Sequence, residues 1–87
     1  MKNLKGTKVR FNEKIFEIYK NDSAAEPLVG SVAEVDDANP NWISFTFEDE
    51  SIQPTGDLNK VVLHALDAEM GGFESLRDLV ENCTDKV

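Results

Sequence analysis

The chain of 87 residues contains one cysteine, Cys83, and one histidine, His64. A single cysteine excludes an intramolecular disulfide and a cysteine-rich zinc site. With only one histidine, a structural zinc site would need carboxylates or a second chain. The sequence also lacks a glycine-rich phosphate loop, since Gly71-Gly72 follows no predicted strand. We therefore expect no cofactor and no resident metal.

Long apolar segments are also absent. No run of about 18 apolar residues is present, so no membrane span is predicted. The first six residues, Met-Lys-Asn-Leu-Lys-Gly, lack the apolar stretch of a signal peptide. We expect a cytoplasmic protein. A hydrophobic content of 40% with 30% charged residues is typical of a globular chain, and the length predicts a single domain over residues 1–87.

Basic residues are scarce and unevenly distributed. The net charge is −8, yet residues 1–20 contain six basic and two acidic residues, a balance of +4. The other 67 residues contain three basic and fifteen acidic ones, a balance of −12. Because contacts to phosphates need a basic surface, this balance argues against direct binding of nucleic acid. It favours either a partner with a basic surface or acidity that serves only solubility.

The clearest structural signal is the segment Trp42–Glu50, which ends in three consecutive carboxylates. Ile43, Phe45 and Phe47 alternate with polar residues, and a period of two with aromatic and β-branched side chains predicts a strand. Turn-forming residues at 37–41 precede it, and residues 28–36 read as the partner strand of a hairpin. Pairing Val35 with Ile43 would place small residues opposite the phenylalanine rings.

A second hairpin is predicted over residues 7–20. Val9 and Phe11 would face Ile18 and Phe16 across a tip at residues 13–14, and Arg10 would then lie opposite Glu17. Residues 1–6 are expected to be a loose lead-in, and residues 21–27 a connection.

Two helices are expected after these strands. The first runs from about Leu58 to Ala68 or Met70, with an apolar face formed by Leu58, Val61, Val62, Ala65 and Leu66, and ends at Gly71-Gly72. The second runs from Phe73 to about Cys83, and residues 84–87 are expected to fray.

Strands followed by helices predict an α+β fold, a four-stranded antiparallel sheet of two hairpins with both helices packed on one face. The alternative is a small SH3-like barrel carrying the helices as appendages. The far face of such an open sheet would be unusually apolar, since it would carry Ile15, Tyr19, Leu28, Val32 and Trp42. Tyr19 and Trp42 are residue types that interfaces favour. Burial by a barrel wall or by loop 21–27 is the competing interpretation.

The acidic residues form the second candidate site. Asp36 and Asp37 lie at one end of the predicted hairpin, and Glu48, Asp49, Glu50 and Asp57 follow the other end. Spaced carboxylates on a small scaffold can imitate a phosphate backbone, although solvated loops are commonly acidic as well. The series Asp37, Asn39, Asn41 and Glu48 matches calcium-loop spacing, but Trp42 stands where that loop needs glycine.

Catalysis has little support. His64 would share a helix face with Lys60 and Asp67, but no nucleophile is placed beside them. Cys83 lies on an apolar stripe, which is typical of a buried inert thiol. The sequence therefore predicts a non-enzymatic, acidic protein-binding module, in one form an inhibitor that occupies a nucleic-acid-binding surface. The alternative is a structural protein that forms a homo-oligomer, such as a dimer, through the Trp42 face.

Overall fold

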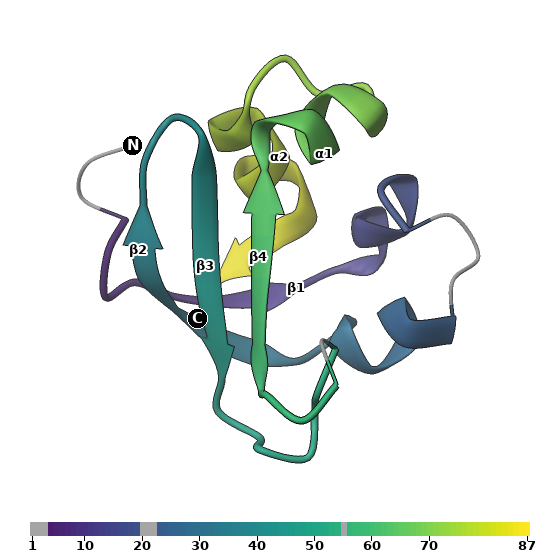
Figure 1. The fold of residues 1–87 in the computed structure, drawn as a ribbon, viewed down its shortest axis with the longest axis vertical. Coiled ribbons are helices and arrows are strands. Elements are labelled where there is room, and N and C mark those ends of the chain that lie inside the picture. The colour runs from purple at the N-terminus through teal and green to yellow at the C-terminus, as the bar shows by residue number, and fades with distance from the viewer. Residues whose placement is uncertain (1–3, 20–22, 55) are drawn as a thin grey trace.

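A computed structural model describes residues 4–19, 23–54 and 56–87. Five antiparallel strands form one sheet in the order β4-β3-β2-β1-β5 (Figure 1). Their bounds are Lys8–Phe11 (β1), Val32–Ala38 (β2), Trp42–Phe47 (β3), Lys60–His64 (β4) and Thr84–Lys86 (β5). The α+β class is confirmed, but the sheet has five strands where four were predicted. The barrel alternative is wrong because β4 and β5 are the two edges of an open sheet.

The hairpin of β2 and β3 is confirmed, with a different register. Val35 pairs with Phe45 and Ala33 with Phe47, two residues away from the predicted pairing. At a bulge between Val35 and Asp37 the register changes by one more residue, so that Ala38 pairs with Ile43, and the strand extends to Ala38. Because a shift of two preserves the alternation, the predicted buried face of β3 is correct.

The hairpin predicted over residues 7–20 is wrong in its second half, as far as that half is described. Residues Glu13–Glu17 form the 3-10 helix η1, and β1 pairs with β2 and β5 instead. The Asn12 side chain accepts a hydrogen bond from the Lys14 N–H at 2.9 Å, which turns the chain into η1. Ile15, Ile18 and Tyr19 follow helical spacing, and this places the fully buried Ile15 in the core.

The connection before β2 also differs from the prediction. Residues Ser23–Leu28 form a second 3-10 helix, η2, so the segment Leu28–Asp36 is not one strand. Gly30 then adopts a φ of 83°, a conformation that glycine reaches without steric cost, and the strand starts at Val32. Leu28 is consequently buried from the end of η2.

The predicted first helix is divided between β4 and α1 (Ala65–Met70). In β4, Val61 and Leu63 are buried while Lys60, Val62 and His64 are exposed, which is the alternation of a strand. Pairing with β3 therefore overrides the apparent helical face. The Asp67 carboxylate accepts the His64 N–H at 2.7 Å at the start of α1, and α1 ends before Gly71 as predicted.

Helix α2 (Leu76–Cys83) starts three residues later than predicted, because Ser75 caps it by accepting the Asp78 N–H at 3.1 Å. Its apolar stripe is buried as expected, at Leu76, Leu79, Val80 and Cys83. Residues 84–86 do not fray but pair with β1 as β5.

The start of the chain is more ordered than predicted where it is described. The Gly6 N–H donates to the Val35 carbonyl at 2.7 Å, and Leu4 packs against the core. Residues 1–3 of the predicted lead-in lie outside the described residues.

One apolar core joins the sheet to α2, η1 and η2. Phe11 lies at its centre, with its ring 5.1 Å from that of Phe45 and 5.5 Å from that of Phe47. The helices supply buried residues to the same cluster and thus cover the same sheet face, so their predicted placement on one face is confirmed. No helix in the described parts of the chain is long and apolar enough to cross a membrane.

Candidate functional site

The predicted apolar sheet face does not form as a unit. Ile15 and Leu28 are buried in the core, and Tyr19 packs against the core from the covered side of the sheet. Trp42 lies on the sheet face opposite the core, which we call the uncovered face. There it pairs with His64 and is half-buried. The structure therefore separates Tyr19 from Trp42. What remains on the uncovered face is a small apolar area that includes the exposed Val62.

Charges on that uncovered face are mixed. The Lys8 ammonium lies 2.7 Å from the Glu48 carboxylate, and this contact raises the pKa of Lys8. Asp36, beside the bulge in β2, accepts a hydrogen bond from the Thr46 hydroxyl and lies 3.5 Å from the Lys60 ammonium. Two of the predicted partner-binding carboxylates, those of Asp36 and Glu48, are thus engaged in ion pairs within the chain.

Asp37 and Asp49 are exposed but have local structural roles. One Asp37 carboxylate oxygen accepts the N–H of Ala38 at 2.9 Å. Asp49 accepts both the hydroxyl of Ser51 at 2.6 Å and its N–H at 2.9 Å, and these hydrogen bonds lower the pKa of Asp49. Both side chains still present negative charge to solvent.

The acidic loop, residues 48–59, joins β3 to β4. It contains four acidic residues and no basic ones. Two of its carboxylates, those of Glu50 and Asp57, are exposed and have no ion-pair or hydrogen-bond partner among the described residues. Unlike the other predicted carboxylates, those of Glu50 and Asp57 are therefore not engaged in contacts among the described residues.

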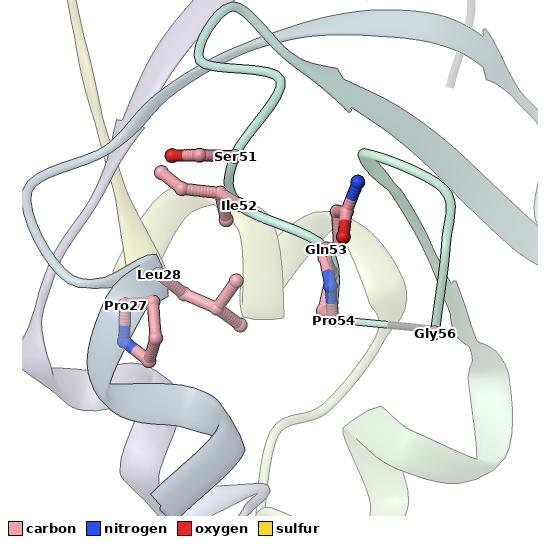
Figure 2. A pocket seen from close by; sticks show the side chains of 7 residues that line it. All are labelled: Pro27, Leu28, Ser51, Ile52, Gln53, Pro54 and Gly56. Carbon is pink, nitrogen blue, oxygen red and sulfur yellow. The ribbon is translucent and has the colours of Figure 1, made fainter.

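A shallow pocket of about 270 Å³ lies between the acidic loop and η2 (Figure 2). We call it the loop pocket. Pro27 and Leu28 form the η2 side, and the chain from Ser51 to Pro54 forms the other, with Gly56 at its margin (Figure 2). Its lining contains four apolar side chains, two uncharged polar ones and no titratable group. Such a lining suits an apolar side chain and offers no acid–base or nucleophilic chemistry.

Sequence analysis identified the acids that flank the loop pocket but not the residues that line it. Pro27 and Leu28 were assigned to a connection and to a strand. Glu50 precedes the lining segment and Asp57 follows it directly, so the acidic residues and the pocket belong to one loop. The sequence signal that could have indicated this pocket is the presence of Pro27, Ile52 and Pro54 among residues predicted to be loops.

Among residues 4–19, 23–54 and 56–87, the geometry adds no support to the catalytic and metal-binding alternatives. His64 Nδ1 lies 3.7 Å from Asp67 Oδ2, and both side chains are at the strand–helix junction. Cys83 is buried, and burial raises the pKa of its thiol to about 11. The described residues contain no group of three or more metal-ligating side chains. Asp37 and Glu48 of the calcium-like series lie at opposite ends of the β2–β3 hairpin.

No protein-family model, curated protein or solved structure matches this chain.

Proposed function

We propose that the protein is a non-enzymatic, acidic binding module that docks on a basic surface of a partner protein through the acidic loop and the loop pocket. The observation that supports this most directly is the position of Glu50 and Asp57. Both carboxylates are exposed and unpaired within the described residues, and both adjoin the apolar loop pocket in the chain.

Charge and apolar surface complement each other at this loop. An interface formed only by exposed ion pairs would have little binding free energy, because each such pair contributes about 0–1 kcal/mol. An apolar side chain inserted beside Leu28 and Ile52 would add hydrophobic burial, while the carboxylates would guide and orient a basic partner. In this proposal, burial of an apolar side chain in the loop pocket supplies affinity, and the carboxylates supply selectivity for a basic partner.

Nucleic-acid-binding proteins are one class of partner with a suitable basic surface. Occupation of such a surface would make this chain an inhibitor, with its carboxylates in the place of phosphates. The net charge of −8 supports this form of the proposal through long-range attraction. The uncovered sheet face contributes less to the attraction of a basic partner, because Lys8 and Lys60 form ion pairs with Glu48 and Asp36 there.

The test is a pull-down from native lysate with tagged protein, washed at low and then at high salt. Glu50→Lys combined with Asp57→Lys should abolish capture of a specific basic protein. Glu13→Lys combined with Glu17→Lys changes the net charge by the same amount on η1 and should leave capture largely intact. Equal loss in both variants would show that only total charge matters, and the loop proposal would then fail.

The second candidate is assembly into a homo-oligomer through the uncovered sheet face. It is favoured by Trp42 and by Val62, which is 41% exposed on the neighbouring strand. A Val62→Lys variant that converted a defined oligomer into a monomer, measured by light scattering, would support this role over the first.

A further inference from the structure

A second hollow lies where α1 and the start of α2 meet the turn between β2 and β3. Figure 1 shows these elements at the end of the molecule opposite the loop between β3 and β4. We call it the helix groove. It has a volume of about 380 Å³, larger than the loop pocket. The Ala65 N–H donates to the Asn41 carbonyl at 2.9 Å, which fixes α1 against the turn. The lining residues are Pro40, Ala65, Ala68, Glu69, Phe73, Glu74, Ser75 and Leu76.

The helix groove combines an apolar floor with two carboxylates. Five of its eight lining residues are apolar, and Phe73 supplies an aromatic ring that also packs against the core. Glu69 comes from the last turn of α1, and Glu74 from the segment that leads into α2. Both glutamates are exposed.

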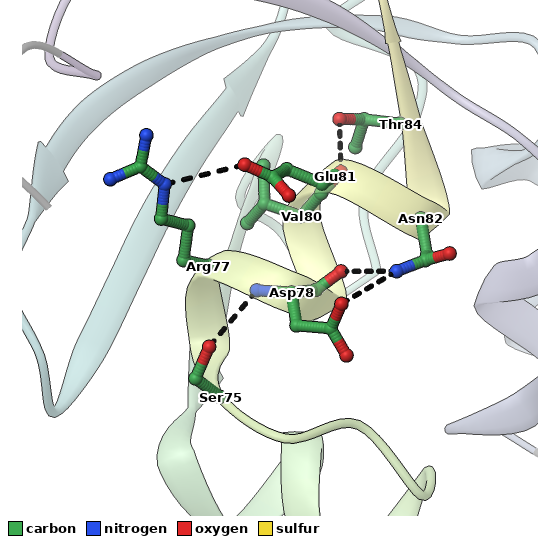
Figure 3. Close-up of polar contacts among 7 residues, drawn as sticks. All are labelled: Ser75, Arg77, Asp78, Val80, Glu81, Asn82 and Thr84. Carbon is green, nitrogen blue, oxygen red and sulfur yellow. Dashed lines mark hydrogen bonds and ion pairs between the residues drawn. The ribbon is translucent and has the colours of Figure 1, made fainter.

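No cation within the described residues neutralises these two glutamates. Arg77 is the only basic residue of α1 and α2, and its Nε lies 3.3 Å from the Glu81 carboxylate (Figure 3). The Asp78 carboxylate is engaged in hydrogen bonds, which it accepts from the Asn82 amide and the Glu74 N–H. The internal contacts of α2 therefore leave the carboxylates of Glu69 and Glu74 without an ion-pair partner in the part of the chain that the structure describes.

We propose that the helix groove binds an arginine side chain of a basic partner protein between Glu69 and Glu74. Charge complementarity identifies the occupant, because the groove presents two negative charges and its own basic neighbour is turned to another acid. Arginine fits better than lysine, since its planar guanidinium can bond both carboxylates and stack on an aromatic ring such as Phe73.

Exposed apolar side chains beside the groove indicate what surrounds that arginine. Leu66 is 63% exposed and Met70 is 61% exposed, and their spacing of four places both on one side of α1 next to Glu69. Large apolar side chains grouped at the surface are typical of interfaces. An arginine flanked by leucine-like residues would therefore cover this part of α1 while it occupies the groove.

This inference rests on the proposed function, since it assigns a second contact to the same kind of basic partner. The helix groove and the acidic loop lie at opposite ends of the molecule (Figure 1). A partner that engaged both would span its long dimension of 30 Å. The two contacts can thus be tested separately.

The experiment is an NMR titration of the ¹⁵N-labelled protein with the capped peptide Gly-Leu-Arg-Leu-Gly at low salt. The same peptide with citrulline, the uncharged isostere of arginine, is the ligand control. We expect amide shifts confined to residues 65–76 with the arginine peptide. Glu69→Gln combined with Glu74→Gln should weaken binding about fivefold, as the loss of two exposed ion pairs implies. Glu13→Gln combined with Glu17→Gln should leave the affinity unchanged.

Several results would overturn the groove assignment. Shifts confined to residues 48–59 would contradict the groove but support the acidic loop as a binding site. Equal binding of the citrulline peptide, or equal weakening by the two variant pairs, would show that no arginine-specific site exists. An absence of shifts would also overturn the groove. In each case the lysate experiment on Glu50 and Asp57 still decides the proposed function independently.

Discussion

The Asn12 side chain joins the first turn of η1 to the end of α2, since its amide nitrogen donates to the carbonyl of Asn82 at 2.9 Å. The same side chain caps η1 by accepting the Lys14 N–H. In addition, the backbone N–H of Asn12 donates to the Cys83 carbonyl at 2.8 Å. One residue thus connects segments about 70 positions apart and fixes where the chain leaves β1.

Asn12→Ala should lower the free energy of unfolding by about 1–2 kcal/mol, because it removes a cap and leaves the Asn82 carbonyl without its amide donor. Urea denaturation followed by circular dichroism measures this change. Asn12→Ser is the matched control. Serine can cap η1 but has no amide group to donate to the Asn82 carbonyl, so this variant should recover part of the lost stability. A loss below about 0.5 kcal/mol for Asn12→Ala would contradict the bridging role.

Adjacent valines in β4 give a second prediction. Val61 is buried and Val62 is exposed, whereas a helix over this segment would place both on one face. Val61→Ala should destabilise the protein by about 1–3 kcal/mol through lost burial, and Val62→Ala by less than about 0.5 kcal/mol. Similar losses at both positions would speak for the helical assignment. Thermal unfolding of the two variants provides the comparison.

The valine pair also shows where sequence reasoning succeeds and fails. The alternation in β3 and the stripe of α2 were predictable because each segment fixes its own buried face. Residues 60–64 were not, because Val61, Val62 and Leu63 are compatible with either period, and the choice depends on pairing with β3. The spacing of Ile15, Ile18 and Tyr19 fits a helix, but Val9, Phe11, Phe16 and Ile18 also fit a cross-strand register, so the local pattern does not decide between the two.

Features of the candidate site likewise fall into those that a local sequence pattern indicates and those that depend on tertiary contacts. The exposure of Glu50 and Asp57 could be predicted from the acidic loop sequence, since charged loop residues stay solvated whatever the tertiary structure. Whether Asp36 and Glu48 were free could not be known, because their partners Lys60 and Lys8 come from other strands. The loop pocket and the helix groove form between segments distant in sequence, so no local pattern indicates them.

Cys83 provides a prediction on pH. Burial raises the pKa of its thiol from the ordinary 9.0 to about 11, so the folded state retains this proton longer than the unfolded state. The stabilising effect is complete below about pH 9 and is lost as the pH rises toward 11. Chemical denaturation at pH 8 and 10.5 should show a decline, on the order of 1–2 kcal/mol, that Cys83→Ala does not show. Parallel pH profiles in the two proteins would rule out this linkage.

If Glu50 and Asp57 serve binding, folding should not need them. Glu50→Gln combined with Asp57→Asn should change the free energy of unfolding by no more than about 0.5 kcal/mol, because neither carboxylate has a partner among the described residues. A small gain is expected at low salt, since removal of two acids from a chain of net charge −8 relieves repulsion. Asp49→Asn is the contrasting variant, because Asp49 bonds to Ser51 and its replacement should weaken the turn. Denaturation curves of both variants at low and high salt measure these effects. If the Glu50–Asp57 pair proved as destabilising as Asp49→Asn, the two carboxylates would have a structural role, and the acidic loop would lose its claim as the binding site.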